Sequence, residues 1–186
     1  VHIRKTTAKR TEKKFDVIGV GAERRDWAFG DLVIAQVRAG RPRAALDIVG
    51  RIDDPRLIIT ALRNIAQAQA RRGDLEESRA MTEIIPDVWN RFEAKASIAR
   101  AEAVLGFHDL ANQTAADVVA LSIKMDRPNR TVASLSNLSK HLRKADSEEA
   151  ADFILNAALK IARQAEMSPG ERHASLSAIA AATADA

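Results

Sequence analysis

The chain has 186 residues, of which 46% are hydrophobic and only 4% aromatic, and its formal net charge is +4. This hydrophobic fraction excludes disorder over the whole length, and a chain rich in Ala, Leu, Ile and Val but poor in aromatics favours packed helices over a sheet. The sequence contains no cysteine, which excludes a disulfide framework and a thiolate metal site.

Localisation is predicted from what the sequence lacks. No apolar run approaches the roughly 20 residues that a helix needs to cross a bilayer. The segment Val1–Lys5 has no apolar core of the kind found in signal peptides. We expect a cytoplasmic protein, and a periplasmic location stays open if a signal peptide has been removed.

The positive charge is concentrated in the first 14 residues. The rest of the chain carries 23 basic and 24 acidic residues, so its charge is close to balanced. We therefore expect residues 1–16 to form a basic, flexible arm and residues 17–184 to form one helical domain. Such an arm suits RNA or an anionic membrane as a partner, because lysine and arginine neutralise phosphates. The basic residues of the arm are Arg4, Lys5, Lys9, Arg10, Lys13 and Lys14.

Helices follow one another with short connections. Apolar residues at helical spacing predict helices over 26–38, 42–51, 55–72, 75–84, 88–105, 109–124, 128–144, 147–165 and 169–183. Asp54 before Pro55 is typical of a helix start, and Gly73 is typical of a residue that ends a helix. Three further starts have the pattern of a capping box. These are Asp74 with Glu77, Asp146 with Glu149, and Ser168 with Glu171.

An internal repeat connects these helices. Residues 35–40 recur as 68–73 and again as 101–106, and the glycines that end them lie 33 residues apart both times (73 − 40 and 106 − 73). A looser fourth copy aligns Ala145 with Gly73, with about one residue deleted from its first helix. Each copy predicts a helix, a tight turn and a second helix.

The segment Gly73-Asp74-Leu75-Glu76-Glu77-Ser78 resembles the turn of the tetratricopeptide family, which commonly has Gly-Asp-Tyr-x-x-Ala. The resemblance covers about residues 26–165 and does not extend to a subfamily, because Leu, Lys and Gln stand at the family's Trp and Tyr positions. It implies an all-α fold, a right-handed α-solenoid of about four helical hairpins with a 33-residue period and a C-terminal capping helix. HEAT-type and pentatricopeptide-like stacks are the near alternatives.

The resemblance also implies a binding surface, because the first helix of each repeat lines the concave face of such stacks. Polar residues follow one stripe of these helices, and most of them are basic. We expect a protein-protein interaction scaffold that binds an acidic or carboxylate-bearing peptide or helix of a partner in this groove. A merely solvated face is the alternative. The candidate residues are Arg63, Asn64, Gln67, Arg71, Arg100, Lys140 and Lys144.

No residue pattern indicates catalysis. The four histidines are dispersed, so we expect no metal site, and no nucleophile motif is present. The stretch Phe15–Gly21 contains a Gly-x-Gly, but Arg24 occupies the third glycine position of a dinucleotide-binding motif and no βαβ pattern follows. We therefore expect no enzyme and no cofactor. Trp27 and Trp89, each at the start of a helix, are expected to pack inside the fold.

Overall fold

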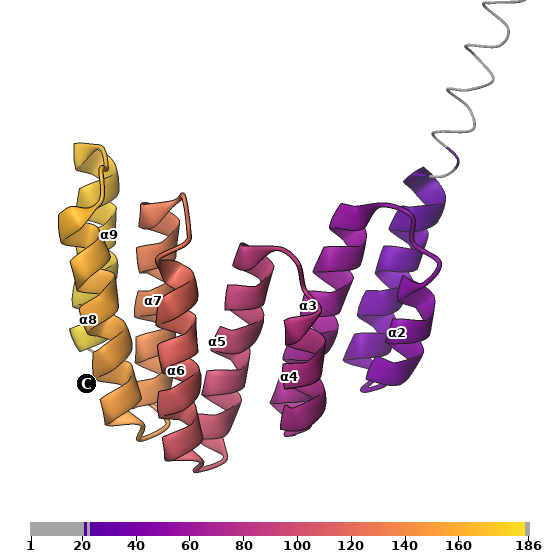
Figure 1. Ribbon diagram of the computed structural model, residues 1–186, viewed down its shortest axis with the longest axis horizontal. Coiled ribbons are helices and arrows are strands. Elements are labelled where there is room, and N and C mark those ends of the chain that lie inside the picture. Colours follow the sequence, from indigo (N-terminus) through magenta and orange to yellow (C-terminus); the bar gives the residue numbers. More distant parts are fainter. Residues whose placement is uncertain (1–20, 22, 185–186) are drawn as a thin grey trace, which may run out of the picture. The chain divides into compact units, whose positions relative to one another are not determined.

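The computed structural model describes residues 21 and 23–184, and this part of the chain is all-helical, without a strand (Figure 1). The predicted all-α fold is therefore confirmed, and most helix ends agree within two residues. The basic arm lies outside the described residues, as does Phe15–Val20. A first helix covers residues 23–38. The others are α2 (Pro42–Val49), α3 (Pro55–Arg72), α4 (Leu75–Glu83), α5 (Val88–Val104), α6 (His108–Ser122), α7 (Pro128–Arg143), α8 (Glu148–Gln164) and α9 (Pro169–Ala184).

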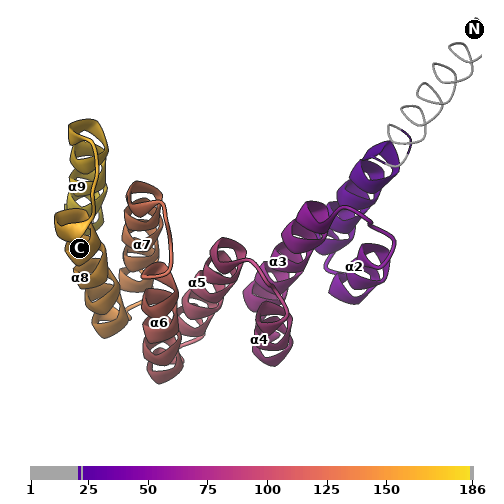
Figure 2. The same ribbon diagram turned by 45° about the horizontal axis from the view of Figure 1, so that its top comes forward.

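The chain divides into two compact units, Val1–Ile65 and Ala66–Ala186, with the boundary inside α3. In the first unit, Val33, Ala45 and Ile52 are buried. In the second, α5 packs on α6 and α7 packs on α8, and α9 lies against both α7 and α8. Figures 1 and 2 both show α9 beside α8 in this unit. Phe92 and many small side chains are fully buried, which lets these helices approach closely.

Glycines end three of the helices in the same way. Gly40, Gly73 and Gly106 have positive φ angles of 71°, 84° and 80°. In each case the amide of the following residue donates to the carbonyl five residues earlier, at 2.8–3.0 Å. This is the Schellman arrangement, and it needs a left-handed residue that glycine adopts without a steric penalty. The prediction that Gly73 ends its helix is confirmed.

A fourth turn of this kind is built on Asp146, whose φ is 56°. Ser147 N donates to the carbonyl of Leu142 at 3.0 Å, which is the same bond five residues back. Asp146 therefore corresponds to Gly73, and the predicted alignment of Ala145 with Gly73 was wrong by one residue. No glycine marks this turn, and aspartate occupies the left-handed position because it tolerates that region better than most residues.

Two buried serines show that the fourth copy has no deletion. Ser78 Oγ donates to the carbonyl of Ala66 at 2.7 Å, and Ser139 Oγ donates to the carbonyl of Ala151 at 2.8 Å. The partners are 12 residues apart in both pairs. Each pair joins the two helices that flank one turn, so the first helices of these two copies have the same length up to the turn.

Of the predicted helix starts, those at Asp54 and Ser168 are confirmed. Asp54 Oδ1 accepts from the backbone N of Arg56 at 2.8 Å. Ser168 N donates to Glu171 Oε2 at 2.9 Å and Glu171 N donates to Ser168 Oγ at 3.3 Å, which is a complete capping box. The other two predicted boxes were wrong. The side chain of Asp74 does not cap α4, and the residue that precedes α8 is Ser147.

The side chain of Asp74 and the position of Asp146 therefore both differ from the prediction. The carboxylate of Asp74 lies 3.3 Å from Arg72 Nε, an ion pair across the turn, which competes with capping. Asp146 sits in the turn itself, one residue before the N-cap. Local spacing to a glutamate three residues later does not distinguish these arrangements.

The two tryptophans differ. Trp89 is half-buried, its ring centroid lies 5.7 Å from that of Phe92, and the Arg130 guanidinium lies 3.7 Å from its centroid. Trp89 therefore packs within the fold as expected. Trp27 is 64% exposed, so the expectation that it packs inside was wrong. It lines a pocket of about 130 Å³ in the first unit together with the buried residues Val33 and Ala61.

Candidate functional site

The predicted binding residues divide between the two units. Arg63 and Asn64 belong to the first unit, where Arg63 Nη2 donates to Asn64 Oδ1 at 3.4 Å. The others belong to the second unit. Gln67 and Arg71 lie on α3, Arg100 lies on α5 and Lys140 lies on α7, and Lys144 is the first residue after α7.

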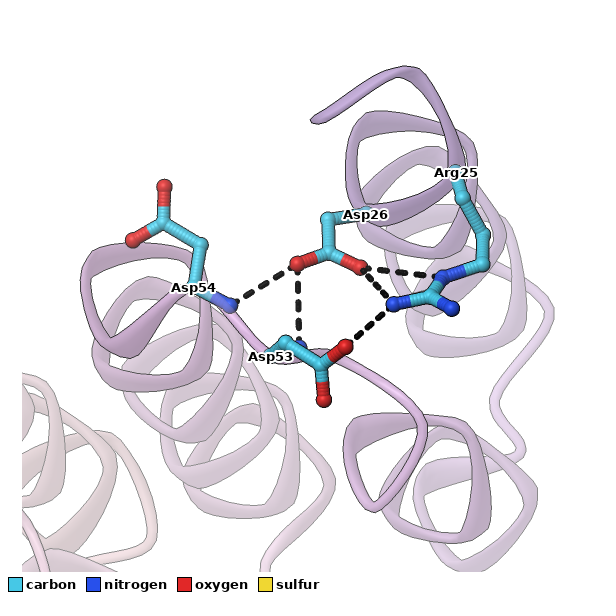
Figure 3. A network of polar contacts seen from close by, with 4 residues as sticks. All are labelled: Arg25, Asp26, Asp53 and Asp54. Carbon is cyan, nitrogen blue, oxygen red and sulfur yellow. Dashed lines mark hydrogen bonds and ion pairs between the residues drawn. The ribbon is translucent and has the colours of Figure 1, made fainter. Parts of the chain in front are cut away.

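A polar network in the first unit was missed by sequence reasoning. Asp26 is buried, and its carboxylate accepts hydrogen bonds from the backbone amides of Asp53 (3.0 Å) and Asp54 (2.8 Å), as Figure 3 shows. Arg25 pairs with both Asp26 and Asp53. Burial raises the pKa of the Asp26 carboxyl, but the two amides and Arg25 outweigh it, so its pKa lies below the ordinary value. The network joins the first helix to the start of α3 and has a structural role.

A pocket of about 340 Å³ lies in the second unit between the end of α3 and the C-terminal half of α5. Two of the predicted residues, Arg71 and Arg100, line it. A third arginine, Arg72, was not predicted, although it stands directly beside Arg71 in the sequence. The pocket, here called the arginine pocket, is lined by Ala70, Arg71, Arg72, Gly73, Ser97, Arg100, Ala101, Val104 and Leu105.

The local structure explains why the cations gather there. Arg71 and Arg72 form the last turn of α3, where the unpaired carbonyls favour positive charge. Gly73 then ends the helix with its left-handed turn, so both arginine side chains lie at the end of α3. Arg100 approaches from the neighbouring helix. Three arginines from α3 and α5 therefore line one pocket.

Positive charge in this pocket is only partly compensated. Arg72 pairs with Asp74 at 3.3 Å. Among the described residues, the side chain of neither Arg71 nor Arg100 makes a hydrogen bond or an ion pair within 4.0 Å. Burial lowers the pKa of Arg100, Glu93 raises it and the like charge of Arg71 lowers it, and the net shift is downward. A bound anion would relieve this repulsion and replace the water that Arg100 has lost.

The rest of the lining is mainly apolar. Ala70 is buried and Ala101 is half-buried, while Val104 and Leu105 are 75% and 49% exposed at the rim. No carboxylate, imidazole or thiol belongs to the described lining, so the pocket contains no acid-base or nucleophile pair. Guanidinium groups beside exposed apolar side chains suit a carboxylate that has an apolar neighbour.

The remaining predicted residues lie outside this pocket. Gln67 Nε2 donates to the backbone carbonyl of Glu93 at 3.4 Å, and the Glu93 carboxylate accepts from Ser134 Oγ at 3.2 Å. Gln67 thus holds α3 to α5. Lys140 is half-buried on α7 and Lys144 is exposed at its end, and neither lines the arginine pocket.

The part of the chain that the structure describes contains neither a metal-binding cluster nor a membrane-spanning helix. No group of three or more His, Cys, Asp or Glu side chains there is placed to hold a metal ion. None of the described helices is both long and apolar enough to span a bilayer. His108 Nδ1 lies 2.6 Å from Ser147 Oγ and His141 Nδ1 lies 2.7 Å from the carbonyl of Asn137, so both histidines have hydrogen-bond partners within the fold.

Comparison with known proteins supports the fold alone. No protein-family model matches the chain, and no curated protein matches it significantly. The crystal structure of Ton1535 from Thermococcus onnurineus NA1 is similar, with a TM-score of 0.56 and 20% sequence identity. The match covers 83% of this chain and 46% of that one, so this chain spans about half the length of Ton1535. The chain thus shares an all-helical fold with a solved protein, and a helical repeat is in keeping with that likeness.

Proposed function

We propose that this chain is a non-enzymatic scaffold of the tetratricopeptide-like solenoid type, which binds an acidic segment of a partner protein. The observation that carries the proposal is the arginine pocket, in which Arg71 and Arg100 have no anionic partner within ion-pair distance among the described residues. The cytoplasm is the compartment we propose, because a chain without cysteine suits a reducing environment.

Two further observations support a repeat scaffold. The same left-handed turn follows the first helix of four successive helical pairs, at Gly40, Gly73, Gly106 and Asp146. The first helices of two pairs, α3 and α5, supply the arginine pocket. Repeat proteins bury each unit against its neighbours and leave such helix faces available to partners.

The test is binding of a fluorescent peptide of alternating leucine and glutamate, compared with a peptide in which every glutamate is glutamine. We expect the wild-type protein to bind only the glutamate peptide, and more weakly as salt is added. The double variant Arg71→Glu and Arg100→Glu is expected to weaken binding at least tenfold, since each exposed or half-exposed pair contributes roughly 0.2–1 kcal/mol and reversal adds repulsion.

A control is Arg163→Glu, to be compared with the single variant Arg71→Glu of equal charge change, since Arg163 is an exposed arginine in the last turn of α8 and does not line the pocket. It changes the net charge without changing the pocket, so it should leave affinity almost unaltered. Equal affinities for the wild type and the double variant would exclude the arginine pocket as the binding site.

The basic arm remains the alternative, and the concentration of charge in residues 1–14 favours it. In that case deletion of residues 1–14 abolishes salt-sensitive binding to RNA or to anionic vesicles, whereas the double arginine variant does not. Binding that survives the deletion would count against the arm.

A further inference from the structure

A second pocket, of about 470 Å³, lies in the second unit where α6 ends, α7 begins and α8 passes by. Its volume falls within the roughly 300–1,000 Å³ that is usual for small-molecule sites. The pocket, here called the Lys160 pocket, shares no residue with the arginine pocket. It is lined by Val119, Ser122, Ile123, Met125, Pro128, Thr131, Ala157, Lys160, Ile161, Gln164 and Ala165.

Most of this lining is apolar. Ile123 is 77% exposed at the end of α6, while Ile161 and Met125 are half-buried. An apolar side chain as exposed as Ile123 gains from any ligand that covers it, because burial of apolar surface is worth about 25 cal/mol per Å². The pocket therefore favours a ligand with a long apolar part.

The pocket has few polar groups, and some of them already make hydrogen bonds within the protein. Each hydroxyl in the lining donates to a backbone carbonyl, Ser122 Oγ at 2.7 Å and Thr131 Oγ1 at 2.9 Å. The side chain of Lys160 is exposed and makes no hydrogen bond or ion pair with any residue that the structure describes, and the same holds for the side chain of Gln164. No acidic residue belongs to the part of the lining that the structure describes. One cation and one amide are thus available to a ligand.

These counts distinguish a small amphiphile from a peptide. A peptide brings one donor and one acceptor with every residue, and each needs a partner when water is excluded. The Lys160 pocket offers partners for a single polar head. We propose that it binds the anion of a straight-chain carboxylic acid, with the apolar tail against Ile123 and Ile161 and the carboxylate at Lys160. The inference does not depend on the arginine pocket.

The probe is sodium decanoate, titrated calorimetrically into the full chain below its micelle concentration, with 1-decanol and butyrate as comparisons. We expect saturable binding of decanoate, and weaker binding of both comparisons, since decanol lacks the charge and butyrate lacks the tail. Lys160→Gln should weaken decanoate about three- to fivefold, as expected for an exposed ion pair, and leave decanol unchanged.

Two further variants keep the outcome unambiguous. Lys124→Gln removes a neighbouring exposed lysine that does not line the pocket, and it should leave decanoate affinity unchanged. Ala157→Leu places a larger side chain in the pocket and should weaken decanoate and decanol together, with an unchanged circular dichroism spectrum. The proposal is overturned if decanoate does not saturate, if Lys160→Gln and Lys124→Gln have equal effects, or if Arg71→Gln with Arg100→Gln removes the binding.

Discussion

Replacing a turn glycine by alanine should distinguish the left-handed positions from ordinary ones. Gly106 has a φ of 80°, and a Cβ built on it meets no atom within 4 Å. Gly170, in the first turn of α9, also has open space around a Cβ, and its φ is not positive. The two sites therefore differ in backbone conformation and not in room for the methyl group, so they form a matched pair.

The magnitude follows from two opposing contributions. A left-handed conformation costs an L-residue roughly 1–2 kcal/mol. The loss of unfolded-state freedom on changing glycine to alanine returns about 0.4–1 kcal/mol. Gly106→Ala should therefore reduce the free energy of unfolding by about 1 kcal/mol. Gly170→Ala should raise it by up to about 1 kcal/mol, because alanine is the better helix former.

The assay is thermal and urea unfolding followed by circular dichroism at 222 nm. For a protein of this size, 1 kcal/mol corresponds to about 2–4 °C in Tm, so the two variants should move Tm in opposite directions. Asp146→Gly should also raise Tm, since it relieves a left-handed aspartate. Shifts of the same sign for Gly106→Ala and Gly170→Ala would refute the assignment of the turn.

Variants at three further positions test individual contacts. Burial raises the pKa of Glu102 although Thr114 and Arg79 lower it, and the net shift is upward, so the folded protein favours the neutral carboxyl. The stability that depends on this neutral form is fully present below the unfolded-state pKa of about 4.3 and is lost as the pH rises through the higher folded-state pKa. Glu102→Gln should therefore flatten the pH dependence of the urea midpoint above about pH 4.3. An unchanged slope would contradict the raised pKa of Glu102. Asp87→Ala removes the cap bond from the backbone N of Asn90 (2.7 Å) and should lower the free energy of unfolding by about 1 kcal/mol, whereas Asp87→Ser should largely retain it. Arg143→Ala removes the hydrogen bond to the Ala182 carbonyl (3.0 Å) and should speed amide hydrogen exchange in α9 more than in α5. Equal changes in the exchange rates of the two helices would count against that contact.

Local signals were enough to predict the helices. Apolar periodicity and the glycines place nearly every helix end within two residues, because helix formation and the Schellman turn depend on neighbours in the sequence. The errors fall where several residues satisfy the same local rule. Aspartate can cap a helix or adopt the left-handed conformation of a turn. The prediction gave Asp146 the capping role, so its alignment of the fourth copy was wrong by one residue. Asp74 could cap α4 or pair with Arg72, and it does the latter.

Contacts between distant residues were not predictable in this way. The Asp26 carboxylate bonds to amides 27 and 28 residues away, and no spacing rule connects them. Trp27 was assigned to the interior from its residue type, whereas its neighbours on other helices decide its exposure. For the candidate site, the polar stripe in the sequence predicted Arg71 and Arg100. The pocket between α3 and α5 and the contribution of Arg72 to it were found only in the structure.

The most direct measurement of acid recognition follows the arginine Nε–Hε signals of Arg71 and Arg100 by NMR during titration with the glutamate peptide. We expect both signals to shift with saturation at one affinity, while the Arg163 signal stays in place and the glutamine peptide causes no shift. Unmoved Arg71 and Arg100 signals, or equal shifts with both peptides, would contradict binding of an acidic segment at the arginine pocket.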